Sequence, residues 1–149
     1  MQVDFYILEA AAERERLRTA CRLADKAWQK GHRVFIHAGS RETARSIDDM
    51  LWTYRQDSFV PHAMYGDRQS TDGQEVDEDT LEPVLVGDGS AHPAEIDVLI
   101  NLAETVPLFA DKSRRVAEIV SADDSGRRTG RIRYRDYLDR GVSIQQHNL

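Results

Sequence analysis

The sequence predicts an α/β fold, with one mostly parallel β-sheet flanked by helices in a single domain over residues 1–149. Short apolar segments typical of buried strands alternate with longer segments whose apolar residues recur at helical spacing. The first four elements follow in the order strand, helix, strand, helix, which implies parallel strands joined by right-handed crossovers. A chain of 149 residues has the usual size of one domain, and no repeat or low-complexity linker marks a boundary.

The first half of the chain supplies those four elements. Residues 3–8 are mostly apolar, as expected of a buried strand. A helix is predicted over about 11–30, and residues 33–37 form the second predicted strand. Ser40 is the expected N-cap of a helix that reaches about Tyr54. The helix over 11–30 carries one apolar stripe, which consists of Leu17, Ala20, Cys21, Ala24 and Trp28.

Three further strands are predicted in the second half, at 83–86, 96–102 and 115–120. Between residues 67 and 104 there are eleven acidic residues and one basic residue. Within this acidic segment, 69–79 has almost no apolar content and is predicted to be a solvated, mobile loop. Its acids do not follow the spacing of a calcium-binding loop, so no metal site is predicted for Asp72, Glu75, Asp77, Glu78 and Asp79.

The last predicted helix begins near residues 123–125, where Asp123, Asp124 and Ser125 offer a cap and negative charge for a helix N-terminus. It should extend to Arg140, and Gly141 is a suitable residue to end it. Between Ser125 and Arg140 there are six arginines and two acids, although the chain as a whole is acidic. This helix therefore holds an unusual concentration of positive charge.

Composition limits the function. The formal charge is −6, from 20 basic and 26 acidic residues, so the surface as a whole does not attract DNA. Cys21 is the only cysteine, which excludes an internal disulfide and suits a reducing compartment. No apolar run approaches the roughly 18 residues of a membrane helix, and no basic segment precedes an apolar one at the start. We therefore expect a cytoplasmic protein that does not enter the membrane.

A group of large aromatic residues precedes Pro61. Trp52 and Tyr54 lie in the last turn of the second predicted helix, and Phe59 lies just before this proline, which favours an extended exit. Large rings are costly to leave in water, so they either seal the helix against the sheet or contact a partner. The sequence pattern is compatible with both alternatives.

Three arginines of the last helix, at positions 127, 131 and 135, follow one another at intervals of four residues, and we call them the arginine strip. Five residues at i, i+4, i+7, i+8 and i+11 lie on neighbouring parts of one face, namely Arg127, Arg131, Tyr134, Arg135 and Leu138. Arginine binds a carboxylate or phosphate through two parallel hydrogen bonds, and the tyrosine and leucine suit an apolar group beside that anion. The alternative is a solvated arginine face that only balances the acidic segment.

Few residues suggest catalysis. No glycine follows the first strand as a dinucleotide fingerprint requires, and no phosphate-binding loop ends in Gly-Lys-Ser or Gly-Lys-Thr. The five histidines have no metal-ligand spacing. His37 at the end of the second strand is the best acid–base candidate, with a structural role as the alternative. Together with Gly39 and Ser40 it would serve a small nucleotide- or phosphate-binding α/β enzyme.

Several motifs together resemble the chi subunit family of bacterial DNA polymerase III holoenzyme. They are Leu51-Trp52, the segment Ser-Phe-Val-Pro-His at 58–62, Pro-Val-Leu-Val at 83–86 and Asp-Val-Leu-Ile-Asn-Leu at 97–102. The resemblance extends from Phe-Tyr-Ile-Leu at 5–8 to Arg-Tyr-Arg-Asp-Tyr at 133–137, so it covers nearly the whole chain.

The resemblance implies a nucleotide-binding-like (Rossmann-like) fold without a nucleotide site or a cofactor. It implies an adaptor in DNA replication that links the clamp-loader complex, through the psi subunit, to single-stranded DNA-binding protein. The adaptor would bind the acidic C-terminal tail of that protein, which ends in Pro-Phe, and would contact DNA only indirectly. It would be a non-catalytic subunit of a DNA-directed DNA polymerase (a nucleotidyltransferase) in the cytoplasm, at the nucleoid or replisome.

The family resemblance also assigns residues. The tail-binding motif falls on Val120, Arg127, Arg131, Tyr134 and Arg135, which agrees with the arginine strip. A second surface, for psi or alternatively a helicase, falls on Trp52 and Phe59. Positions 127 and 135 are commonly lysine in relatives, so arginine here keeps the charge and changes the geometry. Gly126 and Gly130 each weaken a helix by about 1 kcal/mol relative to alanine, which makes the start of the helix hard to predict.

Overall fold

The structure is a computed structural model that describes residues 1–56, 59–65 and 81–149. Two features of the sequence lie outside the described residues. One is Ser58 of the Ser-Phe-Val-Pro-His segment, and the other is the predicted loop 69–79 with its acidic residues.

The described residues form one seven-stranded sheet in which every neighbouring pair of strands is parallel. The strand order is β3-β4-β2-β5-β6-β1-β7. The strands are β1 (Gln2–Ile7), β2 (Val34–His37), β3 (His62–Met64), β4 (Val84–Gly87), β5 (Ile96–Asn101), β6 (Ser113–Val120) and β7 (Ser143–Asn148). The predicted α/β fold with a parallel sheet is confirmed.

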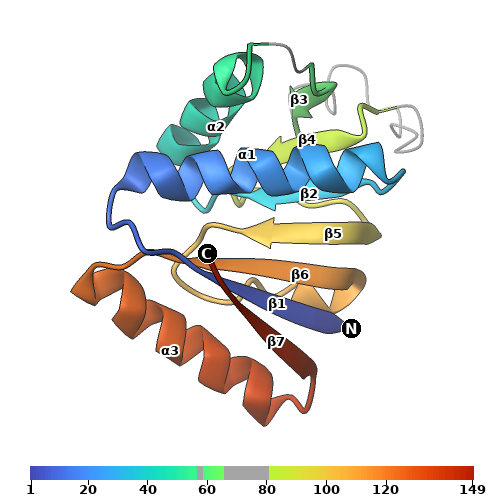
Figure 1. Cartoon of the computed structure of the whole chain (residues 1–149). Coiled ribbons are helices and arrows are strands. Elements are labelled where there is room, and N and C mark those ends of the chain that lie inside the picture. Colours follow the sequence, from blue (N-terminus) through green and yellow to red (C-terminus); the bar gives the residue numbers. More distant parts are fainter. Residues whose placement is uncertain (57–58, 66–80) are drawn as a thin grey trace.

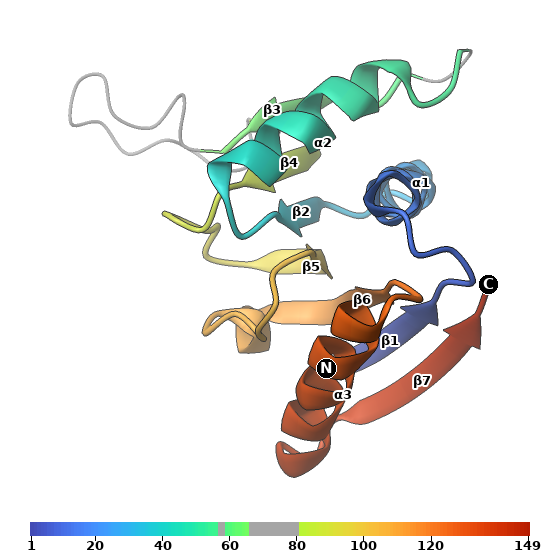
Figure 2. The same ribbon diagram turned by 90° about the vertical axis from the view of Figure 1, so that its left-hand side faces the viewer.

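Three helices flank the sheet: α1 (Glu13–Gln29), α2 (Arg41–Thr53) and α3 (Asp124–Asp139). Helices α1 and α2 pack on one face, and α3 packs on the other face (Figures 1 and 2). Helix α2 covers the β3–β4 end of the sheet, whereas α3 contacts β6 and β7 near the opposite end. A short 3-10 helix, η2 (Ala110–Lys112), precedes β6.

The predicted caps act at the ends of the helices. The Ser40 hydroxyl accepts a hydrogen bond from the Thr43 amide at 3.1 Å, which satisfies a free donor in the first turn of α2. Helix α1 has no such side-chain cap, because Ala12 precedes it. Gly141 follows the last helix with φ of 72°, a left-handed conformation that glycine adopts without strain.

The core has one layer on each face of the sheet. The α1 stripe packs with Ile47 and Leu51 of α2 on one face, and Cys21 is fully buried there as predicted. On the other face, Phe5, Phe35 and other apolar residues pack beneath α3 and the segment before β6. Alternate residues of each strand point to opposite faces, which is why two layers arise from one set of strands.

Two strands were not predicted. Strand β3 has only three residues, immediately after Pro61. Strand β7 has the sequence Ser-Ile-Gln-Gln-His-Asn, and it pairs with β1 as the outermost strand of the sheet. An edge strand with one solvated face does not need the apolar run by which the other strands were recognised. None of the helices in the described part of the chain is both long and apolar enough to cross a membrane.

Candidate functional site

Two glycines let α3 lie close to the end of β6. A Cβ at Gly130 would lie 2.9 Å from Cγ2 of Val120, and one at Gly126 would lie 2.2 Å from the hydroxyl oxygen of Ser121. Neither distance is compatible with a side chain, so both positions require glycine for the observed approach. Glycine at these two positions lowers the stability of the helix relative to alanine, but it allows α3 to approach the sheet closely. Val120 is largely covered by this contact and is 6% exposed.

The start of α3 is well defined despite these glycines. Asp123 is the N-cap, and its carboxylate accepts a hydrogen bond from the Gly126 amide at 3.2 Å. The Ser121 hydroxyl donates a second hydrogen bond to the same carboxylate. These hydrogen bonds hold the pKa of Asp123 below its ordinary value. The helix therefore begins at Asp124, as the predicted cap requires.

A buried polar network fixes the sheet side of α3. Glu118 of β6 has no exposed surface, and its Oε1 accepts a hydrogen bond from Nε of Arg133 at 2.8 Å. Its Oε2 accepts from the Tyr137 hydroxyl at 2.7 Å and from Nδ2 of Asn101 at 2.9 Å. A second guanidinium nitrogen of Arg133 donates to the Glu104 carbonyl at 3.2 Å. The network therefore ties α3 to two strands and to the segment after β5.

The charges in this network are out of contact with water. Burial raises the pKa of the Glu118 carboxyl, and the Arg133 guanidinium and the donated hydrogen bonds oppose that shift. Burial and the adjacent Glu118 also raise the pKa of Tyr137, so the phenol stays a hydrogen-bond donor. A buried ion pair of this kind is strongly coupled, because removing either partner leaves the other charge without compensation.

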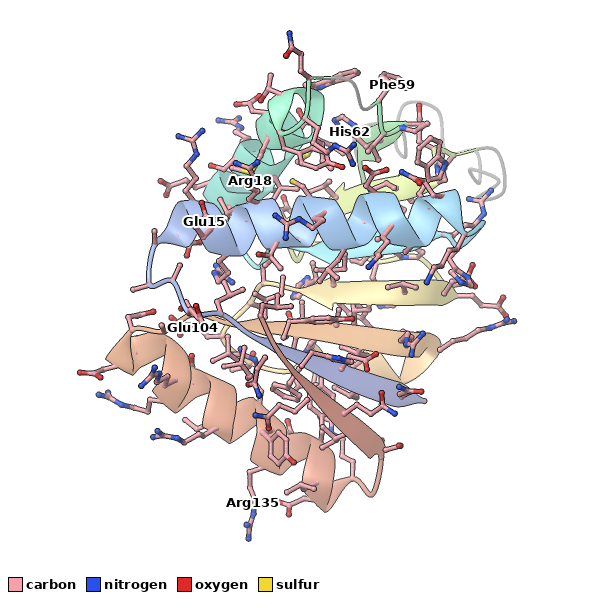
Figure 3. All side chains as sticks on the ribbon, viewed as in Figure 1. Glu15, Arg18, Phe59, His62, Glu104 and Arg135 are labelled. Carbon is pink, nitrogen blue, oxygen red and sulfur yellow. The ribbon has the colours of Figure 1, made fainter. Side chains whose placement is uncertain are left out.

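The arginine strip lies on a different side of the same helix. Arg127, Arg131 and Arg135 follow one another at intervals of four residues, and all three are exposed. Arg135 projects away from the far end of α3 (Figure 3), and its Nε lies 3.6 Å from Oδ1 of Asp139. Within the part of the chain that the structure describes, neither Arg127 nor Arg131 has a carboxylate within 4.0 Å. The strip thus presents guanidinium groups to solvent.

Apolar groups border the strip on its sheet side. Tyr134 is half-buried, and its ring packs edge-on against Phe5 with 5.2 Å between the ring centroids. Leu138, one turn further along, is 48% exposed. The structure therefore brings together the predicted arginines and Tyr134 on one helix face, and Val120 lies beneath the neighbouring turn at Gly130.

The second predicted surface is an exposed aromatic cluster beside β3. Trp52 is 54% exposed and Phe59 is 62% exposed, and their ring centroids lie 5.7 Å apart. The Trp52 ring also lies 4.5 Å from the ring of His62, which is buried at the start of β3. Figure 3 shows Phe59 and His62 close together beside the end of α2. We call Trp52 and Phe59 the aromatic patch.

His62 supports this patch from below. Its Nδ1 donates a hydrogen bond to the Val60 carbonyl at 2.7 Å, which fixes the ring against the backbone of the preceding turn. Its Nε2 lies 3.3 Å from Oδ1 of Asp48 on α2. The alternative that the aromatic rings fill the core is wrong for Trp52 and Phe59. Tyr54 differs from them, because it is half-buried and its hydroxyl donates to the buried carboxylate of Asp25.

The strand-end residues near His37 have structural partners. His37 is 7% exposed and packs edge-on against Phe109 at 5.2 Å. A Cβ at Gly39 would lie 2.8 Å from Cβ of Ala103, so the backbone there already contacts a neighbouring segment. Ser40 uses its hydroxyl oxygen as the cap of α2. Among the described residues, no group of three or more His, Cys, Asp or Glu side chains is arranged to hold a metal ion.

Sequence reasoning missed the role of Arg133. It is one of the six arginines counted in the last helix, yet it lies inside the protein and not on the strip. The signal was present in β6, where Glu118 interrupts an otherwise apolar run of Val-Ala-Glu-Ile-Val. A carboxylate in such a strand needs a buried donor, and the helix that follows the strand carries several arginines that could supply one.

Comparison with solved structures shows the fold alone. The crystal structure of T4 UvsW aligns with 99% of this chain and 41% of its own length, with a TM-score of 0.66 and 9% sequence identity. Such low identity carries no information about function, but it supports a Rossmann-like α/β architecture.

Comparison with curated sequences is more specific. The DNA polymerase III subunit chi of Pseudomonas aeruginosa is 34% identical over 148 residues, which span 99% of this chain and 96% of that protein. The subunit chi of Haemophilus influenzae is 28% identical over 149 residues, 98% of this chain and 96% of the relative. The model of the family described as "DNA polymerase III chi subunit, HolC" matches residues 1–145. The chain therefore belongs to the chi subunit family of DNA polymerase III, a family of DNA replication subunits.

Proposed function

We propose that the chain acts as a replication adaptor and not as a catalyst. In this proposal it links the clamp-loader complex of DNA polymerase III, through the psi subunit, to the C-terminal tail of single-stranded DNA-binding protein. Two separate surfaces are needed for such a link. The arginine strip on α3 and the aromatic patch beside β3 lie near opposite ends of the sheet (Figure 1), so two partners can bind at once.

The arginine strip is suited to the end of an acidic peptide. Arg131, at its centre, would bind the terminal carboxylate through both of its outer nitrogens. Arg127 and Arg135 would contact acidic side chains on either side. Tyr134, together with Val120, would border the position of the terminal phenylalanine ring. An extended peptide end with one apolar anchor and several carboxylates matches this order of groups.

One observation carries the proposal: three exposed arginines lie in line on a helix whose opposite side is locked to the core. The buried pair of Glu118 and Arg133 fixes the rotation of α3, so the strip is held ready to bind. A binding surface on a rigid element loses less conformational entropy when it is occupied.

The aromatic patch is suited to the other partner. Trp52 and Phe59 are large rings of the kind that dominate protein interfaces, and both remain exposed in the isolated chain. We assign psi to this patch, with a helicase as an alternative occupant of the same surface.

The proposal is tested with purified partners. The chain is immobilised, and binding of intact single-stranded DNA-binding protein is compared with binding of the same protein without its tail. Psi is then added to ask whether both partners are retained together. The adaptor proposal predicts that the tail is required and that psi does not displace it. Retention of the tail-less protein at the same level would refute the proposal.

A nucleotide screen separates the adaptor from the enzyme alternative. A small nucleotide- or phosphate-binding enzyme would be stabilised by its ligand, and the melting temperature would rise with ligand concentration. We expect no shift with nucleoside mono-, di- or triphosphates at concentrations up to the millimolar range. A clear shift that disappears in a His37→Gln variant would favour the enzyme.

A further inference from the structure

The sheet face that carries α1 is only partly covered. Helix α1 contacts β2, β5 and β6, and α2 contacts β3 and β4. No helix of the described chain lies over β1 and β7 on this face, as Figure 1 shows. A groove of about 760 Å³ lies here, between the second half of α1 and the open strands. We call it the α1 groove; it does not include any residue of the arginine strip or of the aromatic patch.

The α1 groove is positively charged in an acidic protein. Its lining contains four basic residues, Lys26, Lys30, Arg114 and Arg115, and two acidic residues, Asp4 and Asp97. Four minus two gives a net charge of +2 with histidines neutral, whereas the whole chain has −6. A local field of this sign attracts an anionic partner even when the total charge does not.

Three of these cations are available to a ligand. Lys26, Lys30 and Arg114 are exposed, and within the described residues none of them has a carboxylate within 4.0 Å. Arg115 differs, because its Nε donates to Oδ2 of the buried Asp4 carboxylate at 2.9 Å. This ion pair compensates the negative charge on the floor of the groove.

The floor also offers a stacked pair of rings. Tyr6 of β1 and His147 of β7 lie with their ring planes 15° apart and their centroids 4.8 Å apart. Nε2 of His147 lies 3.0 Å from Oδ1 of Asp4, which holds the imidazole in place. The His147 side chain is 41% exposed, so part of the pair is open to solvent.

We propose that the α1 groove binds single-stranded nucleic acid. Lys26, Lys30 and Arg114 contact phosphates along the rim, and a base stacks on the Tyr6–His147 pair. A cationic groove beside flat rings on an open sheet face is the combination by which proteins bind single strands without sequence preference. An acidic peptide would pair with the cations of the groove, but its carboxylates would not stack on the Tyr6–His147 pair. The proposal adds a direct contact with DNA to an adaptor expected to reach DNA only through its partners.

The test uses the full chain and a fluorescently labelled oligothymidylate of about 20 nucleotides, long enough for the usual footprint of a small domain. Binding is followed by fluorescence anisotropy at several salt concentrations. Each phosphate contact on a single strand contributes about −0.7 to the slope of log K against log salt. Three contacts predict a slope of about −2.

The decisive variant is Lys26→Glu/Lys30→Glu. It should weaken binding at low salt at least about tenfold and reduce the slope to about −0.7, the value for one remaining contact. The matched control is Arg14→Glu/Arg45→Glu, which changes the net charge equally at two exposed arginines outside the groove. The control should bind within about twofold of the wild type. Equal losses in both variants would overturn the proposal, because only the total charge would then matter.

Two further measurements identify the ligand class and the surface. His147→Ala should weaken binding of the oligothymidylate and leave the salt slope unchanged, since it removes stacking and no phosphate contact. Polyglutamate of equal charge should compete poorly with the oligonucleotide. Equal competition by polyglutamate would assign the groove to an acidic peptide. A loss of DNA binding in Arg127→Ala/Arg131→Ala, with no loss in Lys26→Glu/Lys30→Glu, would show that DNA binds to α3 and not to the α1 groove. Absence of binding by the wild type at low salt would also refute the proposal.

Discussion

Replacing Glu118 by methionine tests how the arginine strip is held. Methionine fills nearly the same volume, so the main loss is the carboxylate and not the packing. Nε of Arg133 and the Tyr137 hydroxyl then lack their acceptor, and Nδ2 of Asn101 keeps only its hydrogen bond to the Thr105 carbonyl. Arg133 is 5% exposed, so its charge cannot reach water without moving α3.

The size of the effect follows from this burial. Breaking a buried ion pair by removing one partner costs about 3–5 kcal/mol. At roughly 2–4 °C per kcal/mol for a domain of this size, the melting temperature should fall by roughly 6–20 °C. Glu118→Met/Arg133→Met removes both charges, so it should recover at least about 2 kcal/mol relative to the sum of the two single losses.

Urea denaturation of the four proteins in this cycle gives the coupling free energy. The exposed pair of Arg135 and Asp139 is the matched control, and Asp139→Asn should cost less than about 1 kcal/mol. The single Glu118→Met variant should also bind the tail peptide more weakly, because α3 is no longer fixed. Additive losses in the cycle, or a cost for Glu118→Met as small as that for Asp139→Asn, would show that the buried pair is not what holds α3.

Three other predictions concern separate parts of the structure. Trp52→Ala and Phe59→Ala should each weaken psi binding by more than about 1 kcal/mol with little change in melting temperature, as measured by calorimetry. The control is Leu108→Ala, which removes another exposed apolar side chain. A loss of about 3–5 kcal/mol in the free energy of unfolding would instead indicate that the two rings are packed in the core. Burial raises the pKa of Cys21 to about 12, so a thiol reagent at pH 8 should label it only after unfolding, and rapid labelling of the native chain would contradict its place in the core. Burial, with a contribution from His92, holds the pKa of His37 below its ordinary value of 6.5. The neutral imidazole therefore contributes stability above pH 6.5, and this contribution is lost as the pH falls below that value. Urea titrations at pH 7 and pH 5 should show that the free energy of unfolding falls less in His37→Gln than in the wild type.

Much of the fold was predictable because burial imposes a pattern on the sequence. The apolar stripe of α1 follows the helical period, and the nearly continuous apolar runs of β2, β4 and β5 are typical of parallel strands buried on both faces. The caps at Ser40 and Asp123 were predictable because a helix N-terminus needs acceptors for its free amides. Strand β7 escaped prediction because it is polar and is defined by pairing with β1, a contact across nearly the whole chain.

The candidate site was predictable in part for the same reason. Helical spacing alone places Arg127, Arg131 and Arg135 on one face, and the structure leaves them exposed. The spacing could not show that Arg133 turns inward, since this depends on Glu118 in a strand that packs beneath the helix. It also could not decide whether Trp52 meets the core or the solvent, because that depends on how the chain turns after α2.

Binding of an acidic peptide end by the arginine strip should depend most on Arg131, which lies at the centre of the strip. Isothermal titration calorimetry with a synthetic tail peptide ending in Pro-Phe compares the wild type with Arg131→Ala and Arg131→Lys. A charged hydrogen bond contributes about 1.5–3 kcal/mol, so Arg131→Ala should bind roughly ten- to a hundredfold more weakly. Lysine should recover only part of this loss, because an ammonium group cannot form two parallel hydrogen bonds to a carboxylate.

The same titration is repeated with a peptide that lacks the terminal phenylalanine and at higher salt. Both changes should weaken binding to the wild type, since the ring loses its place beside Tyr134 and salt screens the exposed arginines over about 8 Å at physiological ionic strength. The largest loss of affinity is expected for Arg131→Ala with the intact peptide. Equal affinity of the wild type and Arg131→Ala, or equal affinity for the peptides with and without the phenylalanine, would show that the strip does not bind the peptide end in this way.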